Sequence, residues 1–449
     1  MKKKYVRWTL WTIASPFILF IILCILIYLP PIQNFLVDKA AVYASEATGM
    51  NISVGRISLS FPLNLVVTNV DAASPHNDTL LSVRRLQVNV QLLPLLKKQV
   101  EVDGISLQGA TVNSNDLIHG MKLNGTLGEL FISSHGVALD PETAIVNKVL
   151  LKDTDLSLCL NDTAAADTAA SDTAYWKIIL QDIDLQNVSF ALDMPLDSLS
   201  LAASLDNAIL RDGLIDLHKS AYSLQTFRIE NGRVRYDNGK PLAADSLSSG
   251  LDPSHIALTD IGVKLDSLYY GGRNMKAIIS QFVLKERSGV EIVSATGRMV
   301  SNDKVLRVPS LKLETRDSYL ELNAAMDWNA LDFKDEGLVS ARLMADIGKP
   351  DVVRFMGSMD EKFIRQYPSE PLRIRTGIDG DLNKLKLTTL TAELPGALGL
   401  FARGELTHLT DSLLRGGDIT LEAETKDLKF VSTLAEGIEI PYGTRLEGK

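Results

Sequence analysis

The stretch VEVDGISLQGATVN, residues 100–113, carries the pattern that organises most of this chain. The apolar residues that define the pattern are Val102, Ile105, Leu107 and Val112, with Gly109 between the last two. Alternation of apolar with polar or small side chains is typical of a β-strand with one face turned from water. A plain strand returns to the same face every second residue, so odd steps of three and five residues require a bulge or bend.

The spacing recurs as a template with apolar residues at offsets zero, three, five and ten and a turn-forming or small residue at offset seven. Four full copies are Val102-Ile105-Leu107-Gly109-Val112, Val146-Val149-Leu151-Asp153-Leu156, Leu180-Ile183-Leu185-Asn187-Phe190 and Leu224-Phe227-Ile229-Asn231-Val234. Copies beginning at Leu258 and Val308 are partial. A second recurrence, Gly-x-Leu-x-x-Leu, begins at Gly125, Gly380 and Gly404.

These offsets predict two irregularities in each strand. Asp103-Gly104 or Gln225-Thr226 should bulge or turn a corner, and the Gly or Asn at offset seven can add a second bend through a positive φ. The expected fold is mainly β: an N-terminal transmembrane helix followed by an elongated, curved, repetitive β-sheet groove, like a folded taco, with few short helices.

One face of this sheet is expected to be apolar throughout. It must be covered by folding into a sandwich or barrel, or remain a groove occupied by something apolar, for which acyl chains are the obvious candidate beside a membrane. The residues expected to line the groove are Val102, Ile105, Leu107, Val112, Ile183, Leu185, Phe190, Phe227, Ile229 and Val234.

The N-terminus, MKKKYVRWTLWTIASPFILFIILCILIYLPP, predicts a membrane anchor. Its 22 residues from Trp8 to Leu29 carry no charge and would extend roughly 33 Å as a helix, enough to cross a hydrocarbon core of about 30 Å. The preceding lysines and Arg7 favour a cytoplasmic N-terminus. The alternative is an unusually long cleaved signal. The expected anchor residues are Trp8, Phe17, Phe20 and Leu29.

The chain divides by pattern into five parts: a basic tail and anchor (1–31), an amphipathic juxtamembrane helix that ends at Gly49 (32–49), a first β region (50–160), a low-complexity loop (161–174) and a repetitive β region (175–449). Residues 349–366 are expected to be helical, with Pro350 in the first turn.

Composition argues against several functions. The net charge of −9 disfavours nucleic acid as a partner. The six histidines show no paired metal spacing, and no nucleophile elbow, phosphate loop or dinucleotide fingerprint is present. We therefore expect no catalytic residues, no metal site, no cofactor and no enzyme activity. Arg228, Arg233 and Arg235 could grip a phosphate headgroup, although such a run is more often the solvated face of a strand.

Three segments resemble the AsmA-like superfamily and, within it, the translocation and assembly module proteins of the TamB type. They are GMNISVGRISLSFPLNLVVTNVDA (49–72), LLSVRRLQVNVQLLPLLKKQVEVDGISLQGATVN (80–113) and PLRIRTGIDGDLNKLKLTTLTAELPGALGLFARGELTHLTD (371–411). TamB proteins are much longer, so the chain is expected to be an N-terminal piece or a truncated member.

The resemblance implies a single-pass inner-membrane protein of a Gram-negative cell, with its bulk in the periplasm. Two functions remain open: an apolar groove that shields and conducts phospholipid between inner and outer membranes, or a structural, chaperone-like factor for outer-membrane protein assembly beside a TamA-like barrel. An uninterrupted apolar face favours the first, and polar plugs favour the second.

Triplets of Asp-Ser/Thr with an aliphatic residue or alanine recur eight times and resemble O-glycosylation sites of some Gram-negative periplasms. The competing explanation is that Asp-Ser and Asp-Thr mark turns. The triplets begin at Asp78, Asp162, Asp167, Asp172, Asp197, Asp245, Asp266 and Asp411.

Overall fold

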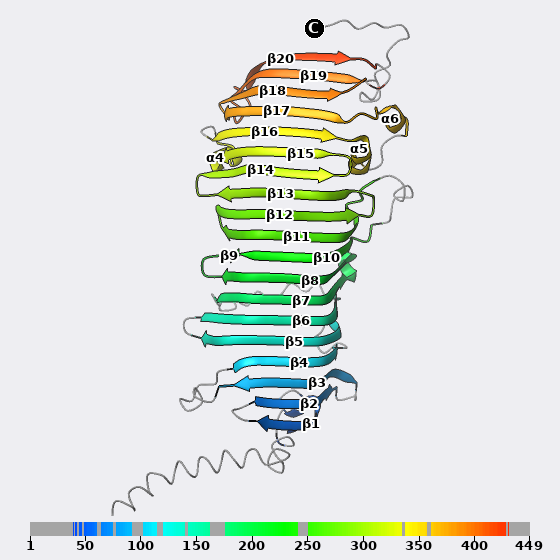
Figure 1. Ribbon diagram of the computed structural model, residues 1–449, viewed down its shortest axis with the longest axis vertical. Helices are drawn as coiled ribbons and strands as arrows, with labels where there is room; N and C mark the ends of the chain where they lie inside the picture. Colours follow the sequence, from blue (N-terminus) through cyan, green and yellow to red (C-terminus); the bar gives the residue numbers. More distant parts are fainter. Residues whose placement is uncertain are drawn as a thin grey trace, which may run out of the picture. The chain divides into compact units, whose positions relative to one another are not determined.

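The computed structural model (Figure 1) describes residues 39, 41–42, 45–46, 49–60, 64–74, 78–91, 102–114, 120–139, 142–161, 176–240, 250–334, 337–356, 361–427 and 430. Of these residues, 74% lie in strands, so the fold is mainly β, with few helices. The predicted anchor, with Trp8, Phe17, Phe20 and Leu29, lies outside the described residues. Within the described part, no helix is long and apolar enough to cross a membrane.

Two compact units divide near Leu196. The first holds β1 (Asn51–Ser60), β2 (Asn64–Ala73), β3 (Thr79–Val90), β4 (Val102–Asn113), β5 (Met121–Leu139), β6 (Glu142–Leu160) and β7 (Lys177–Met194) from Ile178 on. Strands β1 to β6 pair with their sequence neighbours as an antiparallel meander. The predicted loop at 161–174 precedes β7, one strand before the division between the units.

Strands β6 and β7 run in the same direction. The side chain of Asn147 donates to Gln181 Oε1 at 2.9 Å, and Asn187 Nδ2 donates to Asp153 Oδ1 at 2.9 Å. Both pairs are 34 residues apart, so the order along β6 matches the order along β7. Parallel neighbours need a connection of a dozen or more residues, and 16 residues separate Leu160 from Lys177 in the sequence.

The second unit is also a meander. It holds β8 (Leu199–Asp216), β9 (Ala221–Leu224), β10 (Thr226–Asp237), β11 (His255–Gly271), β12 (Asn274–Glu286), β13 (Glu291–Ser301), β14 (Val305–Thr315), β15 (Tyr319–Asp327), β16 (Leu338–Ile347), β17 (Leu372–Asp381), β18 (Lys384–Leu394), β19 (Leu398–Thr407) and β20 (Gly416–Thr425). Both β9 and β10 pair with β8 and β11, and every later strand pairs antiparallel with the next.

Four short helical segments are described after β7: η1 (Pro195–Asp197), α4 (Trp328–Leu331), α5 (Lys349–Met356) and α6 (Glu361–Gln366). The helix expected over 349–366 is thus two helices, α5 and α6. In the predicted juxtamembrane helix, the described residues from Lys39 to Glu46 are helical. Gly49 has a φ of 70° and donates its N–H to Ser45 O at 2.9 Å, as expected of a helix end.

The predicted bend at offset seven is confirmed in all four template copies. The φ angles of Gly109, Asp153, Asn187 and Asn231 are 60°, 49°, 51° and 53°. Among residues with a Cβ, Asn and Asp adopt this left-handed region most readily because their short polar side chains can bond locally. The chemistry at offset seven therefore determines where each strand bends.

The predicted irregularity near the start of a copy is also confirmed in three of the four copies. The register of β3 with β4 passes over Asp103 between Val102 and Gly104, and the register of β5 with β6 passes over Asn147 between Val146 and Lys148. In the fourth copy, Gln225 separates β9 from β10. All three residues occupy the second position of the template, so the bulge belongs to the repeat.

The partial copy beginning at Leu258 was placed in the wrong register. The left-handed residue of β11 is Asp260, with a φ of 53°, which aligns the copy from Pro253 instead. The sequence analysis did not predict two further bends, at Asn69 and Asp212, where the φ angles are 53° and 51°. Proline or alanine holds at least one apolar position in each of these copies, which weakens the sequence signal.

The glycines of the second recurrence are required by sterics. Gly125, Gly380 and Gly404 have φ angles of 154°, 139° and 152°. A Cβ at these positions would lie 2.1, 2.2 and 2.1 Å from a carbonyl oxygen of the neighbouring strand. No residue with a side chain fits there without moving the backbone.

Candidate functional site: two faces of different chemistry

Two rows of aliphatic side chains cross the first unit, each taking one residue from every strand of β1 to β6. Residues paired across neighbouring strands share a face, as do residues two apart along a strand, so both rows lie on one face. The first row is Ile57–Val67–Leu86–Leu107–Leu130–Leu151, and the second is Leu59–Leu65–Val88–Ile105–Ile132–Val149. We call these and their counterparts in the second unit the aliphatic rows.

The opposite face of the first unit is polar. One residue along from the first row, the paired residues are Arg56–Thr68–Arg85–Gln108–Glu129–Lys152. Antiparallel sheets often have one face in water and one packed on a core. In the first unit, the face that carries the aliphatic rows has the composition of the packed face.

That face has no described cover. None of the twelve row residues is fully buried, and Ile105 is 37% exposed. In the described part of the first unit, the buried hydrophobic residues are Ala72, Leu80 and Val83. Burying one aliphatic side chain contributes about 1.5–3 kcal/mol, so the rows retain a large capacity to stabilise contact with another apolar body.

The aliphatic rows of the second unit are longer. One takes a residue from each of twelve strands and contains no charged side chain. It is Leu210–Phe227–Leu265–Ile279–Gly297–Leu311–Leu322–Leu343–Thr376–Leu390–Ala402–Leu421. The other crosses β13 to β20 as Ala295–Leu313–Leu320–Ala345–Ile374–Ala392–Leu400–Ala423.

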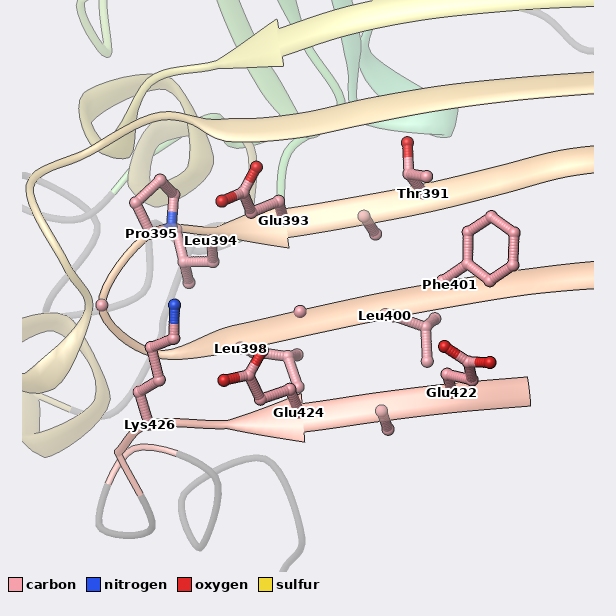
Figure 2. Close-up of a pocket in the computed structure, with 14 residues that line it drawn as sticks. Thr391, Glu393, Leu394, Pro395, Leu398, Leu400, Phe401, Glu422, Glu424 and Lys426 are labelled. Carbon is pink, nitrogen blue, oxygen red and sulfur yellow. The ribbon is translucent and has the colours of Figure 1, made fainter. Parts of the chain in front are cut away.

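The reverse face of this unit is charged. Its paired residues include Glu314–Tyr319–Asp346–Arg373–Glu393–Gly399–Glu424. Figure 2 shows the alternation: Thr391, Glu393 and Phe401 project to one side of β18 and β19, and Leu394 and Leu400 project to the other. The pocket of about 630 Å³ whose lining is drawn there includes Gly399, which pairs with Glu393 on one side and Glu424 on the other. It mixes acidic, basic and apolar groups and singles out no ligand.

The structure brings five of the ten predicted lining residues to these rows or beside them. Ile105, Leu107 and Phe227 are row members, and the 34-residue offset between β6 and β7 places Ile183 beside Val149 and Leu185 beside Leu151.

The remaining predicted residues lie in adjoining positions. Ile229 pairs with Ala208 and Val263, Val234 with Ala203 and Leu258, and Val112 with Leu81. Phe190, beyond the bend in β7, is 38% exposed. Val102 pairs with Val90, and its side chain lies outside the described part.

Two of the three arginines of the predicted basic cluster lie near carboxylates. Arg228 Nη1 lies 3.9 Å from Glu230 Oε1, and Arg233 Nη1 lies 3.6 Å from Asp206 Oδ1. These exposed pairs favour the solvated-face interpretation over a headgroup site.

The buried His255 lies between two carboxylates. Its Nδ1 lies 2.8 Å from Asp252 Oδ2, and its Nε2 lies 3.6 Å from Asp237 Oδ1. The Ser254 backbone N–H and the His255 ring hold the pKa of Asp252 below its usual value. Among the described residues, no cluster of three or more His, Cys, Asp or Glu could hold a metal ion.

Four Asp-Ser/Thr triplets fall in the described part. Ser198 and Ser412 are exposed in turns, Thr79 is exposed at the start of β3, and Ser267 lies within β11. Three of the four mark turns or strand ends, consistent with the turn explanation; glycosylation remains a prediction.

Sequence reasoning missed an apolar cavity of about 430 Å³ in the second unit, bounded on one side by the sheet and on the other by two helices. It lies among α5, α6, the ends of β16 to β19 and Phe430. Its lining is Ile347, Val352, Phe355, Phe363, Tyr367, Leu372, Leu394, Leu398 and Phe430. The available signal was the spacing of Phe363 and Tyr367, which is one helical turn.

No family model matches the chain, and no curated protein matches its sequence. These two comparisons therefore name no family for the chain.

Proposed function

We propose that the aliphatic rows bind hydrocarbon chains of phospholipids and shield them from water while they pass between the inner and outer membranes. The observation that carries this proposal is a twelve-strand row without a charged side chain, backed by a charged opposite face. An apolar surface of this extent is typical of a binding site. The rows contain no array of donors for a headgroup, so the proposed recognition is of the acyl chain.

The length of the twelve-strand row supports movement of a lipid along the row rather than storage of a lipid at one place. With strands about 4.8 Å apart, twelve strands span about 50 Å. An acyl chain in one leaflet covers about 15 Å, half of a 30 Å hydrocarbon core. One chain therefore occupies only part of the row and can move along it without meeting a charged group.

The second candidate, a structural or chaperone-like role beside a TamA-like barrel, has less support. It is favoured by polar plugs in the apolar face, and Thr376 is the one polar side chain in the twelve-strand row. A threonine can bond its own backbone, so it does not interrupt an apolar path as a charge would.

The proposal includes location. The uncharged stretch from Trp8 to Leu29 and the basic residues before it support a single inner-membrane span with a cytoplasmic N-terminus and a periplasmic bulk. Protease added to spheroplasts should degrade most of the protein. A mature N-terminus downstream of Leu29 would overturn the anchor.

A pair of matched substitutions tests the binding surface. Leu107→Asp puts a carboxylate in the first row, and Ser106→Asp puts the same group on the opposite face, one residue away. An unpaired charge is poorly tolerated against hydrocarbon. Leu107→Asp should remain folded and lose co-purifying lipid, measured by mass spectrometry, while Ser106→Asp retains it.

Thermal unfolding of both variants separates the alternatives. A folded Leu107→Asp protein with undiminished lipid would exclude Leu107 from the binding surface. Gross unfolding of this variant alone would indicate that the rows form a closed core. Leu185→Asp repeats the test on β7.

A further inference from the structure

The cavity beneath α5 and α6 continues the aliphatic face. Its floor is the row Ile347–Leu372–Leu394–Leu398, whose members lie two residues beyond Ala345, Ile374, Ala392 and Leu400. Steps of two residues keep the same face of the sheet. The cavity therefore adjoins the aliphatic rows at the strand ends of β16 to β19.

The side of the cavity opposite this floor, which we call the roof, is largely aromatic. Val352 and Phe355 come from α5, Phe363 from α6, and Tyr367 directly follows α6. The rings of Phe363, Tyr367 and Phe430 lie with their centroids 5.7 Å apart in each pair. Figure 1 shows α5 and α6 beside the ends of β15 and β17.

Polar contacts outside the cavity hold this roof. Asp351 of α5 is 1% exposed and accepts hydrogen bonds from Thr315 Oγ1, from Ser318 Oγ at 2.6 Å and from Arg354 Nη1 at 3.1 Å. Lys349 Nζ donates to Tyr367 O at 2.7 Å, which joins the start of α5 to the residue after α6. The roof is thus fixed without any need for the cavity to be filled.

The lining sets the chemistry of an occupant. Eight of the nine lining side chains are wholly apolar, and burial raises the pKa of the ninth, Tyr367. A headgroup placed there would lose its hydrogen bonds to water. A volume of about 430 Å³ is roughly three times that of a dry cavity of about 150 Å³ that takes one benzene. It holds part of a hydrocarbon chain and excludes a whole phospholipid.

We infer that this cavity binds the methyl end of a lipid acyl chain that lies on the aliphatic rows. The inference rests on the proposed function and adds to it a retention site at the strand ends of β16 to β19. Phe355, which is 55% exposed, lies at the mouth. A chain end seated there meets the sheet floor on one side and side chains of α5, α6 and Phe430 on the other, whereas a chain on the open rows is held from one side.

Photolabelling of the full-length protein tests the site. The probe is a phosphatidylethanolamine with a diazirine at the methyl end of one palmitoyl chain, and the comparison probe carries the diazirine near the carboxyl end. The methyl-end probe should label cavity residues such as Phe363 and Leu398, and the carboxyl-end probe should label them at least tenfold less.

Val352→Phe fills the cavity from the roof and should reduce methyl-end labelling there at least tenfold, while labelling of Leu343 and Leu107 persists. Leu343→Phe is the control for added bulk on the open rows, and Leu372→Phe fills the cavity from the floor if Val352→Phe does not fold. Labelled rows with an unlabelled cavity, as when a peptide segment fills it, would overturn this inference and leave the proposed function standing.

Cavity labelling that survives both filling variants would also overturn the inference. Absence of label on both rows and cavity would overturn the proposed function together with it.

Discussion

Asn187 Nδ2 donates to Asp153 Oδ1 across 2.9 Å, and both residues have left-handed backbones, with φ angles of 51° and 49°. Each is the bend residue of its template copy, and the copies lie on parallel strands 34 residues apart. The repeat thus aligns two strands through the side chains that bend them. Since the same register brings Ile183 and Leu185 beside Val149 and Leu151, this contact helps to position the aliphatic rows.

Asn187→Ala should destabilise the first unit by about 1–2 kcal/mol, because alanine is strained at positive φ and lacks the amide donor. Asn187→Gly keeps the backbone conformation and should cost less. Urea unfolding of the two variants measures the difference. Equal losses would show that the hydrogen bond, and not the bend, sets the cost.

Gly404→Ala should destabilise the second unit by at least about 2 kcal/mol. Its Cβ would meet Asp418 O at 2.1 Å and Ile419 Cα at 2.7 Å. Gly399→Ala is the control in the same strand, since its Cβ would meet Glu424 only at 4.0 Å. Thermal unfolding should separate the two variants clearly; similar melting temperatures would contradict the steric argument.

Asp351→Ala should cost about 3 kcal/mol, because it removes a buried carboxylate and leaves its donors on Thr315, Ser318 and Arg354 without that acceptor. The control is Asp332→Ala, which breaks the more exposed pair with Arg273 at 3.0 Å and should cost no more than about 1 kcal/mol. Proteolysis near α5 reports whether the roof has loosened. Unchanged protection in Asp351→Ala would show that apolar packing alone holds the helices.

Asp252 should contribute to acid sensitivity. Its pKa in the folded protein lies below the ordinary value of 3.8, chiefly because the Ser254 backbone N–H bonds to the carboxylate, and then because His255 does. The ionised form therefore stabilises the fold above about pH 4, and this contribution disappears as the pH falls through the folded-state pKa. Asp252→Asn should lower the melting temperature at pH 7, and the difference from wild type should shrink toward pH 3. A difference that stays constant over this range would show that the carboxylate's charge is not responsible.

The local features of the strands could be predicted from the sequence. The bends at Gly109, Asp153, Asn187 and Asn231 and the bulge at Asp103 follow from side-chain chemistry, since Gly, Asn and Asp differ from other residues in their own φ preferences. An apolar pattern interrupted by such residues also predicts a sheet with one apolar face. The bend at Asp260 was missed because proline holds the first apolar position of its copy, which shifted the expected register.

The tertiary structure decided which strands are neighbours and what covers each part of the face. Alternation is the same in every strand, so it carries no information on partners. The parallel pairing of β6 with β7 and the continuous rows became visible only through the register. The cavity required helices α5 and α6 to fold back over β16 to β19, which depends on a buried carboxylate at Asp351 meeting hydroxyls from Thr315 and Ser318 more than 30 residues away. Contacts between distant residues are selected by the packing of the whole unit, and no local preference encodes them.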